Sequence, residues 1–144
     1  MWPSPELPDR ALLLHEQLAE DEHERDANSR FYVRDDGAFF HSRNRAAGDP
    51  GRPWDTDFPD KPVRQLDAGA VAELRAALAG FPRLAARYAR PPGAPAPSHP
   101  VTERWTAVVD GRPRTVVVEE DAVPPPLAEL RALIDRLVAA SARA

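Results

Sequence analysis

The 144-residue sequence contains no cysteine. Disulfide bonds, cysteine-based zinc sites and thiol catalysis are therefore excluded. A long apolar run is missing as well, because the three leucines at positions 12–14 are followed at once by His15 and Glu16. This pattern predicts neither a signal peptide nor a transmembrane helix. We expect a cytoplasmic protein with no membrane partner.

Lysine is nearly absent, and Lys61 is the one lysine among 19 basic residues. The net charge of −4 does not favour a nucleic-acid partner. The charge is uneven, since residues 1–28 hold eight acidic and two basic residues. The seven glycines form neither a phosphate-binding loop nor a dinucleotide-binding fingerprint, and no cofactor is predicted.

The acidic start of the chain has the pattern of a helix over residues 9–26. Asp9 is a favourable N-cap, and Leu14 and Leu18 lie one helical turn apart. We therefore interpret residues 1–28 as an acidic helical extension, followed by a single domain over residues 29–144.

The remaining elements are marked by turn and capping residues. Asp36-Gly37 and Asp110-Gly111 each separate two β-prone runs and predict hairpins over residues 30–42 and 102–120, with type I′ turns. Helices are predicted over 67–80 and 124–141, with another short helix after Pro82. The 17 prolines mark loops at 43–65 and 91–101. The expected fold is α+β, with helices on one face of a four-stranded, mainly antiparallel sheet in the order ββαββα.

One spacing in the acidic segment points to metal chemistry. Glu16, Glu20 and His23 would share one face of a helix, and Glu-x-x-His is the spacing of di-iron carboxylate proteins. Such sites take ligands from several helices, and the sequence has no second Glu-x-x-His. We predict no metal site within one chain. A metal site would require ligands from several chains of an oligomer, and the sequence does not indicate the oligomeric state.

The loop at 43–65 carries Trp54 and Phe58 among several arginines. Tryptophan and arginine are enriched at the energetic centres of protein interfaces. The alternative interpretation is that both aromatic side chains fold back onto the domain as part of its core. No nucleophile and base stand in a recognisable catalytic context, and we predict a protein that is not an enzyme.

The second half of the chain resembles the emfourins, which are small bacterial inhibitors of thermolysin-like zinc metallopeptidases. The resemblance is strongest over residues 103–138. It is carried by the runs 105–111, 114–118 and 121–124 and by Leu127, Leu130, Ile134 and Leu137. In the first hairpin, Asp36-Gly37 stands where the family has a double glycine. The resemblance implies a protein inhibitor, and no inhibitory residue is transferred from it.

Three functional hypotheses follow. The first is a non-enzymatic protein-binding domain that inhibits or regulates a thermolysin-like metallopeptidase, as the resemblance implies. The second is an assembly or adaptor subunit that docks through the acidic N-terminal helix. The third is a metal-binding protein that uses Glu20 and His23 across an oligomer. The candidate binding residues are Asp36, Gly37, Trp54, Phe58, Asp110 and Gly111.

Overall fold

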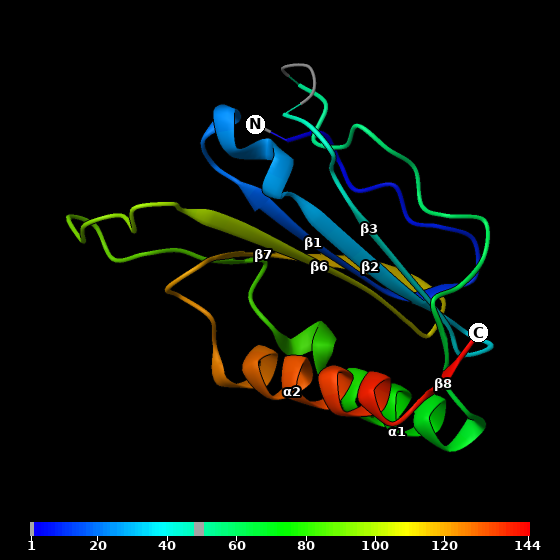
Figure 1. Cartoon of the computed structure of the whole chain (residues 1–144). Helices are drawn as coiled ribbons and strands as arrows, with labels where there is room; N and C mark the ends of the chain where they lie inside the picture. Colours follow the sequence, from blue (N-terminus) through cyan, green and yellow to red (C-terminus); the bar gives the residue numbers. More distant parts are fainter. Residues whose placement is uncertain (1, 48–50) are drawn as a thin grey trace.

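The computed structural model describes residues 2–47 and 51–144, which form an eight-stranded mixed sheet with its helices on one face (Figure 1). The strand order is β5-β7-β6-β1-β2-β3-β4-β8. β5 and β7 pair in parallel, and the other neighbours pair antiparallel. The strands are β1 Ala11–Ala19, β2 Ser29–Arg34, β3 Ala38–Arg43, β4 Arg64–Gln65, β5 Arg87–Tyr88, β6 Val101–Val109, β7 Arg112–Glu119 and β8 Ala142–Arg143.

The helix expected over residues 9–26 is wrong, because β1 occupies this segment at the centre of the sheet. β1 pairs with β2 on one side and with β6 on the other, and all its residues except Gln17 are buried. A strand covered on both faces loses the two-residue alternation of a half-buried strand. Leu14 and Leu18 are thus both buried in a strand, although their spacing also fits a helical turn. A short 3-10 helix, Glu22–Ala27, follows β1.

The expected four-stranded sheet is also wrong. β1 adds a central strand, and the two-residue strands β4, β5 and β8 extend the sheet at its edges. β4 lies in the segment 43–65, which the sequence predicted as a loop. The helix predicted after Pro82 is replaced by a 3-10 turn, Phe81–Arg83, and by β5. Two-residue strands depend on their neighbours in the sheet, and no sequence period reveals them.

Both predicted hairpins form, as β2–β3 and β6–β7. Asp110 and Gly111 have φ values of 52° and 73°, as a type I′ turn requires. The first turn differs from the prediction. Gly37 has φ 89° but Asp36 does not have a positive φ, so residues 35–37 form a three-residue loop with glycine in the left-handed position.

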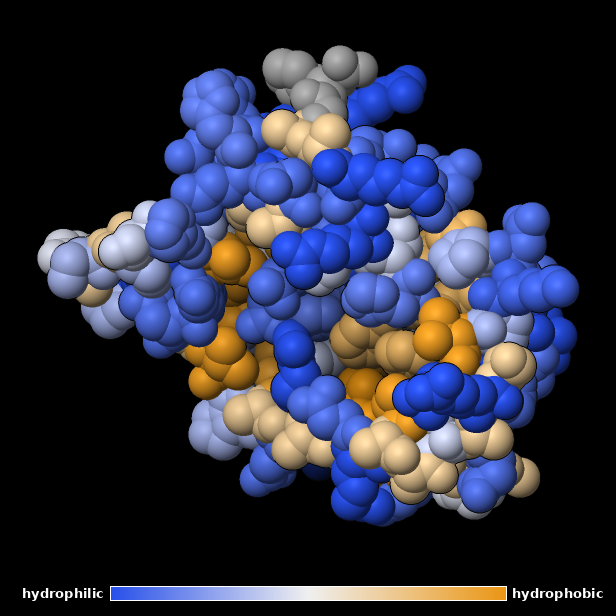
Figure 2. Space-filling view, viewed as in Figure 1, coloured by the Kyte–Doolittle hydropathy of each residue, from blue (hydrophilic) through white to orange (hydrophobic). Residues whose placement is uncertain are grey.

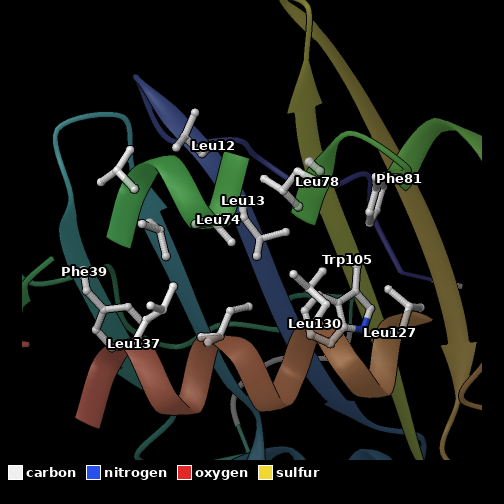
Figure 3. Packing of buried hydrophobic residues seen from close by; sticks show 14 of the residues in the cluster. Leu12, Leu13, Phe39, Leu74, Leu78, Phe81, Trp105, Leu127, Leu130 and Leu137 are labelled. Atoms are coloured by element: carbon white, nitrogen blue, oxygen red, sulfur yellow. The ribbon is translucent and has the colours of Figure 1, made fainter. Parts of the chain in front are cut away.

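Two helices cover one face of the sheet, as expected. α1 (Ala68–Leu78) begins at Asp67, whose side chain accepts a hydrogen bond of 2.8 Å from the Ala70 N–H. α2 (Pro125–Ala139) begins with prolines, which suit the first helical turn. Figure 3 shows their apolar faces packed on the sheet, with core side chains that include Leu13, Phe39, Leu74, Leu78, Phe81, Trp105, Leu127, Leu130 and Leu137.

The opposite face of the sheet is covered by the N-terminal segment and by the loop after β3 (Figure 1). A second apolar cluster lies there, in which Leu7 and Phe58 pack onto Leu14, Tyr32 and Phe40. In the view of Figure 2, apolar residues reach the surface mainly between the sheet and the helices, and polar residues dominate elsewhere. No helix in the described ranges combines the length and the apolar content needed to cross a membrane.

Candidate functional site

The two predicted hairpin turns lie at the same end of the sheet. β1 starts at this end, where Ala11 is opposite Arg34 of β2 and Leu13 is opposite Ala107 of β6. The turns that follow β2 and β6 therefore flank the first residues of β1. We call this region the turn end and define it by Arg10, Asp35, Asp36, Gly37, Asp110 and Gly111.

The turn at Asp36 and Gly37 is held by several polar contacts. The Arg34 guanidinium donates two hydrogen bonds to the Asp36 carboxylate, at 2.9 and 2.8 Å, and the Ala38 N–H donates a third at 3.1 Å. The hydrogen bond from Arg34 is the largest cause that lowers the pKa of Asp36, to about 2. Gln65 Nε2 donates to the backbone carbonyl of Asp36 at 2.7 Å. The turn is therefore ordered before any partner binds.

Left-handed backbone at residues other than glycine is concentrated at the turn end. In the described ranges, only Arg10 (φ 62°) and Asp110 (φ 52°) have this conformation among non-glycine residues. It costs an arginine roughly 1–2 kcal/mol. Arg10 forms an ion pair with Asp35 at 2.8 Å, and its carbonyl accepts a hydrogen bond of 2.9 Å from the Asp35 N–H. Strain of this kind persists where the surrounding structure imposes it, and it often lies at functional sites.

The Asp110–Gly111 turn is exposed and lies between two hollows. The larger hollow has a volume of about 610 Å³ and is lined by Pro82, Val109, Asp110, Arg112, Pro113 and Arg114. The smaller, of about 250 Å³, includes Leu12, Arg75, Leu78 and Asp110 in its lining. Three arginines and one aspartate thus surround the turn, which gives this surface a positive charge.

Trp54 and Phe58 lie on the face of the sheet away from the helices, where both are half-buried. Trp54 Nε1 donates a hydrogen bond of 3.2 Å to Glu16, and Phe58 contacts the Tyr32 ring edge-on at 4.7 Å between centroids. The Arg30 guanidinium lies over both aromatic rings, 4.5 Å from Trp54 and 4.3 Å from Phe58. The two aromatic side chains therefore pack against the domain, and they are separate from the turn end.

Two asparagines fix the loop that carries Trp54. Asn28 and Asn44 are buried, and their side-chain amides donate to the Pro53 carbonyl at 2.9 and 2.7 Å. Asn28 Oδ1 also accepts a hydrogen bond of 2.7 Å from the Ala19 N–H at the end of β1. These contacts join the loop to the central strand and set the position of Trp54 beside Glu16.

Sequence reasoning missed a row of charged side chains across three strands. Glu16 of β1 is directly opposite Arg30 of β2 and Arg104 of β6. Glu16 and Arg104 are 1% and 5% exposed. Glu16 Oε2 accepts hydrogen bonds from Arg104 Nη2 at 2.9 Å and from Trp54 Nε1. The one signal in the sequence is Arg104 beside Trp105 in the predicted second hairpin, and it becomes informative only when β1 is known to be a strand.

Several buried polar atoms in this row lack partners among the described residues: Glu16 Oε1, Arg30 Nε and Arg104 Nε. A buried polar atom without a hydrogen bond costs about 1–3 kcal/mol, and more when its group is charged. Burial lowers the pKa of Arg30. The negative charges of Glu16 and Asp57 act in the opposite direction, but burial is the larger effect. The row therefore carries more positive charge than its one carboxylate balances.

A second polar cluster lies on the helix face of β1. His15 is 3% exposed, its ring stacks on Phe31, and its Nε2 lies 2.7 Å from Glu103 Oε1 and 2.9 Å from Arg131 Nη2. Burial lowers the pKa of His15, and this effect outweighs the hydrogen bond to Glu103. Burial would raise the pKa of Glu103, but its contacts with His15 and Arg131 lower it. Sequence analysis noted His15 only as a residue that ends the apolar run at positions 12–14.

The residues considered for metal binding do not share a helical face, because the helix is absent. Glu16 is buried in β1, Glu20 lies at the end of this strand and pairs with Arg90, and His23 is exposed in the 3-10 helix. In the part of the chain that the structure describes, no group of three or more metal-binding side chains converges.

Comparison with known proteins yields no relative. No family model, curated protein or solved structure matches this chain.

Proposed function

We propose that this chain is a non-enzymatic protein-binding domain that inhibits or regulates a thermolysin-like metallopeptidase through its turn end. The observation that carries the proposal is the left-handed backbone of Arg10 beside two hairpin turns, of which Asp36 and the Asp110–Gly111 turn are exposed. An inhibitor gains affinity when its contact segment is already ordered, because less conformational entropy is lost on binding. The pinned turn at Asp36 meets this requirement.

The charge around the Asp110–Gly111 turn indicates the kind of partner surface. Arg75, Arg112 and Arg114 line the hollows on either side of Asp110. A cleft lined by carboxylates would complement them and would accelerate association at low ionic strength. The resemblance to emfourins, strongest over residues 103–138, includes the β6–β7 hairpin and supports the same choice. We place this interaction in the cytoplasm.

The second hypothesis, an assembly or adaptor subunit, depended on docking through an acidic N-terminal helix. The acidic N-terminal helix does not form, and much of that segment is the buried strand β1. No observation in the described residues favours this hypothesis over the turn end, and it is not pursued.

The test is a titration of a thermolysin-like metallopeptidase, preferably from the same organism, with the purified protein. We expect loss of peptidase activity near one equivalent. Arg112→Glu should weaken inhibition by about tenfold or more, because it reverses the charge at the exposed turn. Arg43→Glu is the matched control, since Arg43 is exposed on β3 at the opposite end of the sheet. Full peptidase activity at large excess, or equal effects of both substitutions, would contradict the proposal.

A further inference from the structure

A polar cavity lies beside the row of charged side chains on the face of the sheet away from the helices. Its volume is about 300 Å³, which is at the lower end of the range for small-molecule sites. Both the N-terminal segment and the loop that carries Trp54 contribute to its walls. Its charged lining consists of Glu6, Glu16, Arg30, Arg52, Asp57 and Arg104.

Three residues that line the cavity carry a buried polar atom without a hydrogen-bond partner among the described residues. Glu16 is 1% exposed, and its Oε1 atom has no hydrogen-bond partner in the described ranges. The Nε atoms of Arg30 and Arg104 are also buried and have no hydrogen-bond partner among the described residues. A buried carboxylate oxygen requires a donor, and a buried guanidinium N–H requires an acceptor. A ligand of this cavity should therefore carry both a hydrogen-bond donor and a hydrogen-bond acceptor.

The charged residues that line the cavity indicate the chemical class of its ligand. Three guanidinium groups and three carboxylates surround the cavity, so a ligand without net charge is favoured over a simple anion or a simple cation. We propose that this cavity is a binding site for a small zwitterion that carries both an ammonium group and a carboxylate, the chemical class of free α-amino acids.

The unsatisfied atoms determine the orientation of the ligand. Its ammonium group donates to Glu16 Oε1, while Oε2 keeps its hydrogen bonds from Arg104 and Trp54. Its carboxylate accepts from the guanidinium groups of Arg30 and Arg104, where planar N–H donors match carboxylate geometry. The indole of Trp54 forms part of the wall.

This inference is independent of the proposed inhibitory function. The cavity and the turn end share no residue, and the cavity is walled by segments that the turn end does not include. Its test uses the protein alone, so failure of one proposal does not affect the other.

The first experiment measures tryptophan fluorescence and melting temperature of the full chain with each of the common L-α-amino acids, up to about 10 mM. We expect at least one to bind saturably and to raise the melting temperature. For that amino acid, the analogue without the amino group and the analogue without the carboxylate should each bind about tenfold or more weakly, because each leaves a buried charge unpaired.

Substitutions then locate the site. Glu16→Gln should weaken binding by about tenfold or more, because it removes the negative charge that meets the ammonium group. Since Glu16 is also structural, Arg52→Ala provides a second variant at an exposed residue of the rim. Arg83→Ala is its matched control, because Arg83 is exposed in the 3-10 helix Phe81–Arg83 and does not line the cavity. Binding should be reduced by Arg52→Ala and unchanged by Arg83→Ala.

Two results would overturn the inference. One is the absence of any change in fluorescence or melting temperature with all the amino acids at about 10 mM. The other is equal affinity for the zwitterion and for its analogue without an amino group, which would leave Glu16 Oε1 without a role.

Discussion

His15 and Glu16 are consecutive residues of β1, and their side chains are buried on opposite faces of the sheet. His15 contacts Glu103 and Arg131 on the helix side, whereas Glu16 contacts Arg104 and Trp54 on the other side. Successive side chains of a strand alternate between faces, so one central strand supplies a buried ionisable group to each layer. This relationship underlies the first two predictions.

The stability of the protein should fall as the pH drops below about 6.5, the usual pKa of histidine. The native pKa of His15 is lowered, so the unfolded chain binds the proton more readily. The contribution of His15 to the free energy of unfolding is fully present above the pKa of the unfolded state. It falls by about 1.4 kcal/mol per pH unit as the pH drops from the unfolded-state pKa to the native-state pKa. Urea unfolding at several pH values measures this slope.

The matched variant for this prediction is His15→Gln, which removes the titrating group. Glu103, Arg131 and Asp135 are the charged groups that act on His15, and all of them remain. The variant should lose the share of the slope between pH 6.5 and 5 that comes from His15. The contribution of His41, whose pKa is also lowered by burial, remains, as does the opposite contribution of His99, whose pKa is raised by its hydrogen bond to Glu24. Asp36 does not interfere, because its lowered pKa of about 2 makes its contribution disappear only below its unfolded value of 3.8. An unchanged slope in the variant would contradict the assignment.

Removing one partner of the Glu16–Arg104 ion pair should destabilise the protein more than replacing both partners with apolar residues. Arg104→Met alone leaves a buried carboxylate with reduced compensation, for which the expected loss is about 3–5 kcal/mol. The double variant Glu16→Leu, Arg104→Met removes both charges and should recover most of this loss. Chemical unfolding of the single variants and of the double variant gives the coupling energy. Additive losses would show that the two charges do not compensate each other.

Gly37→Ala should be the most damaging of three glycine substitutions. A Cβ atom at Gly37 would lie 2.2 Å from the Leu66 carbonyl oxygen, and φ is also positive. Gly111 has positive φ but open space, and Gly80 has open space and φ −84°. We expect losses of roughly 3 kcal/mol at Gly37 and about 1–2 kcal/mol at Gly111, and no loss at Gly80. Equal losses at Gly37 and Gly111 would exclude the steric contribution.

Arg10→Gly should be more stable than Arg10→Ala by about 1 kcal/mol, since glycine adopts a positive φ without strain. Both variants lose the ion pair with Asp35, so their difference isolates the backbone. Thermal unfolding measures it. If the proposed function is correct, Arg10→Gly should also inhibit the peptidase less well than the wild type, because the turn end becomes less rigid.

The sequence predicted the hairpin positions and both long helices because their signals are local. Asp110-Gly111 forms the type I′ turn that an Asp-Gly pair favours, and Asp67 caps a helix through its own side chain. The first turn adopts another conformation, since Gly37 packs against the carbonyl of Leu66, a residue distant in sequence. The position of a turn was thus predictable, and its exact geometry was not.

The sequence by itself determined two hairpins, two amphipathic helices and the absence of cysteine chemistry. Only the tertiary structure decided that residues 11–19 form the central strand. Glu16 is tolerated there because Arg104 and Trp54, from distant parts of the chain, satisfy one of its oxygens. Local propensity cannot anticipate such partners, because burial of a charge depends on which strands become neighbours.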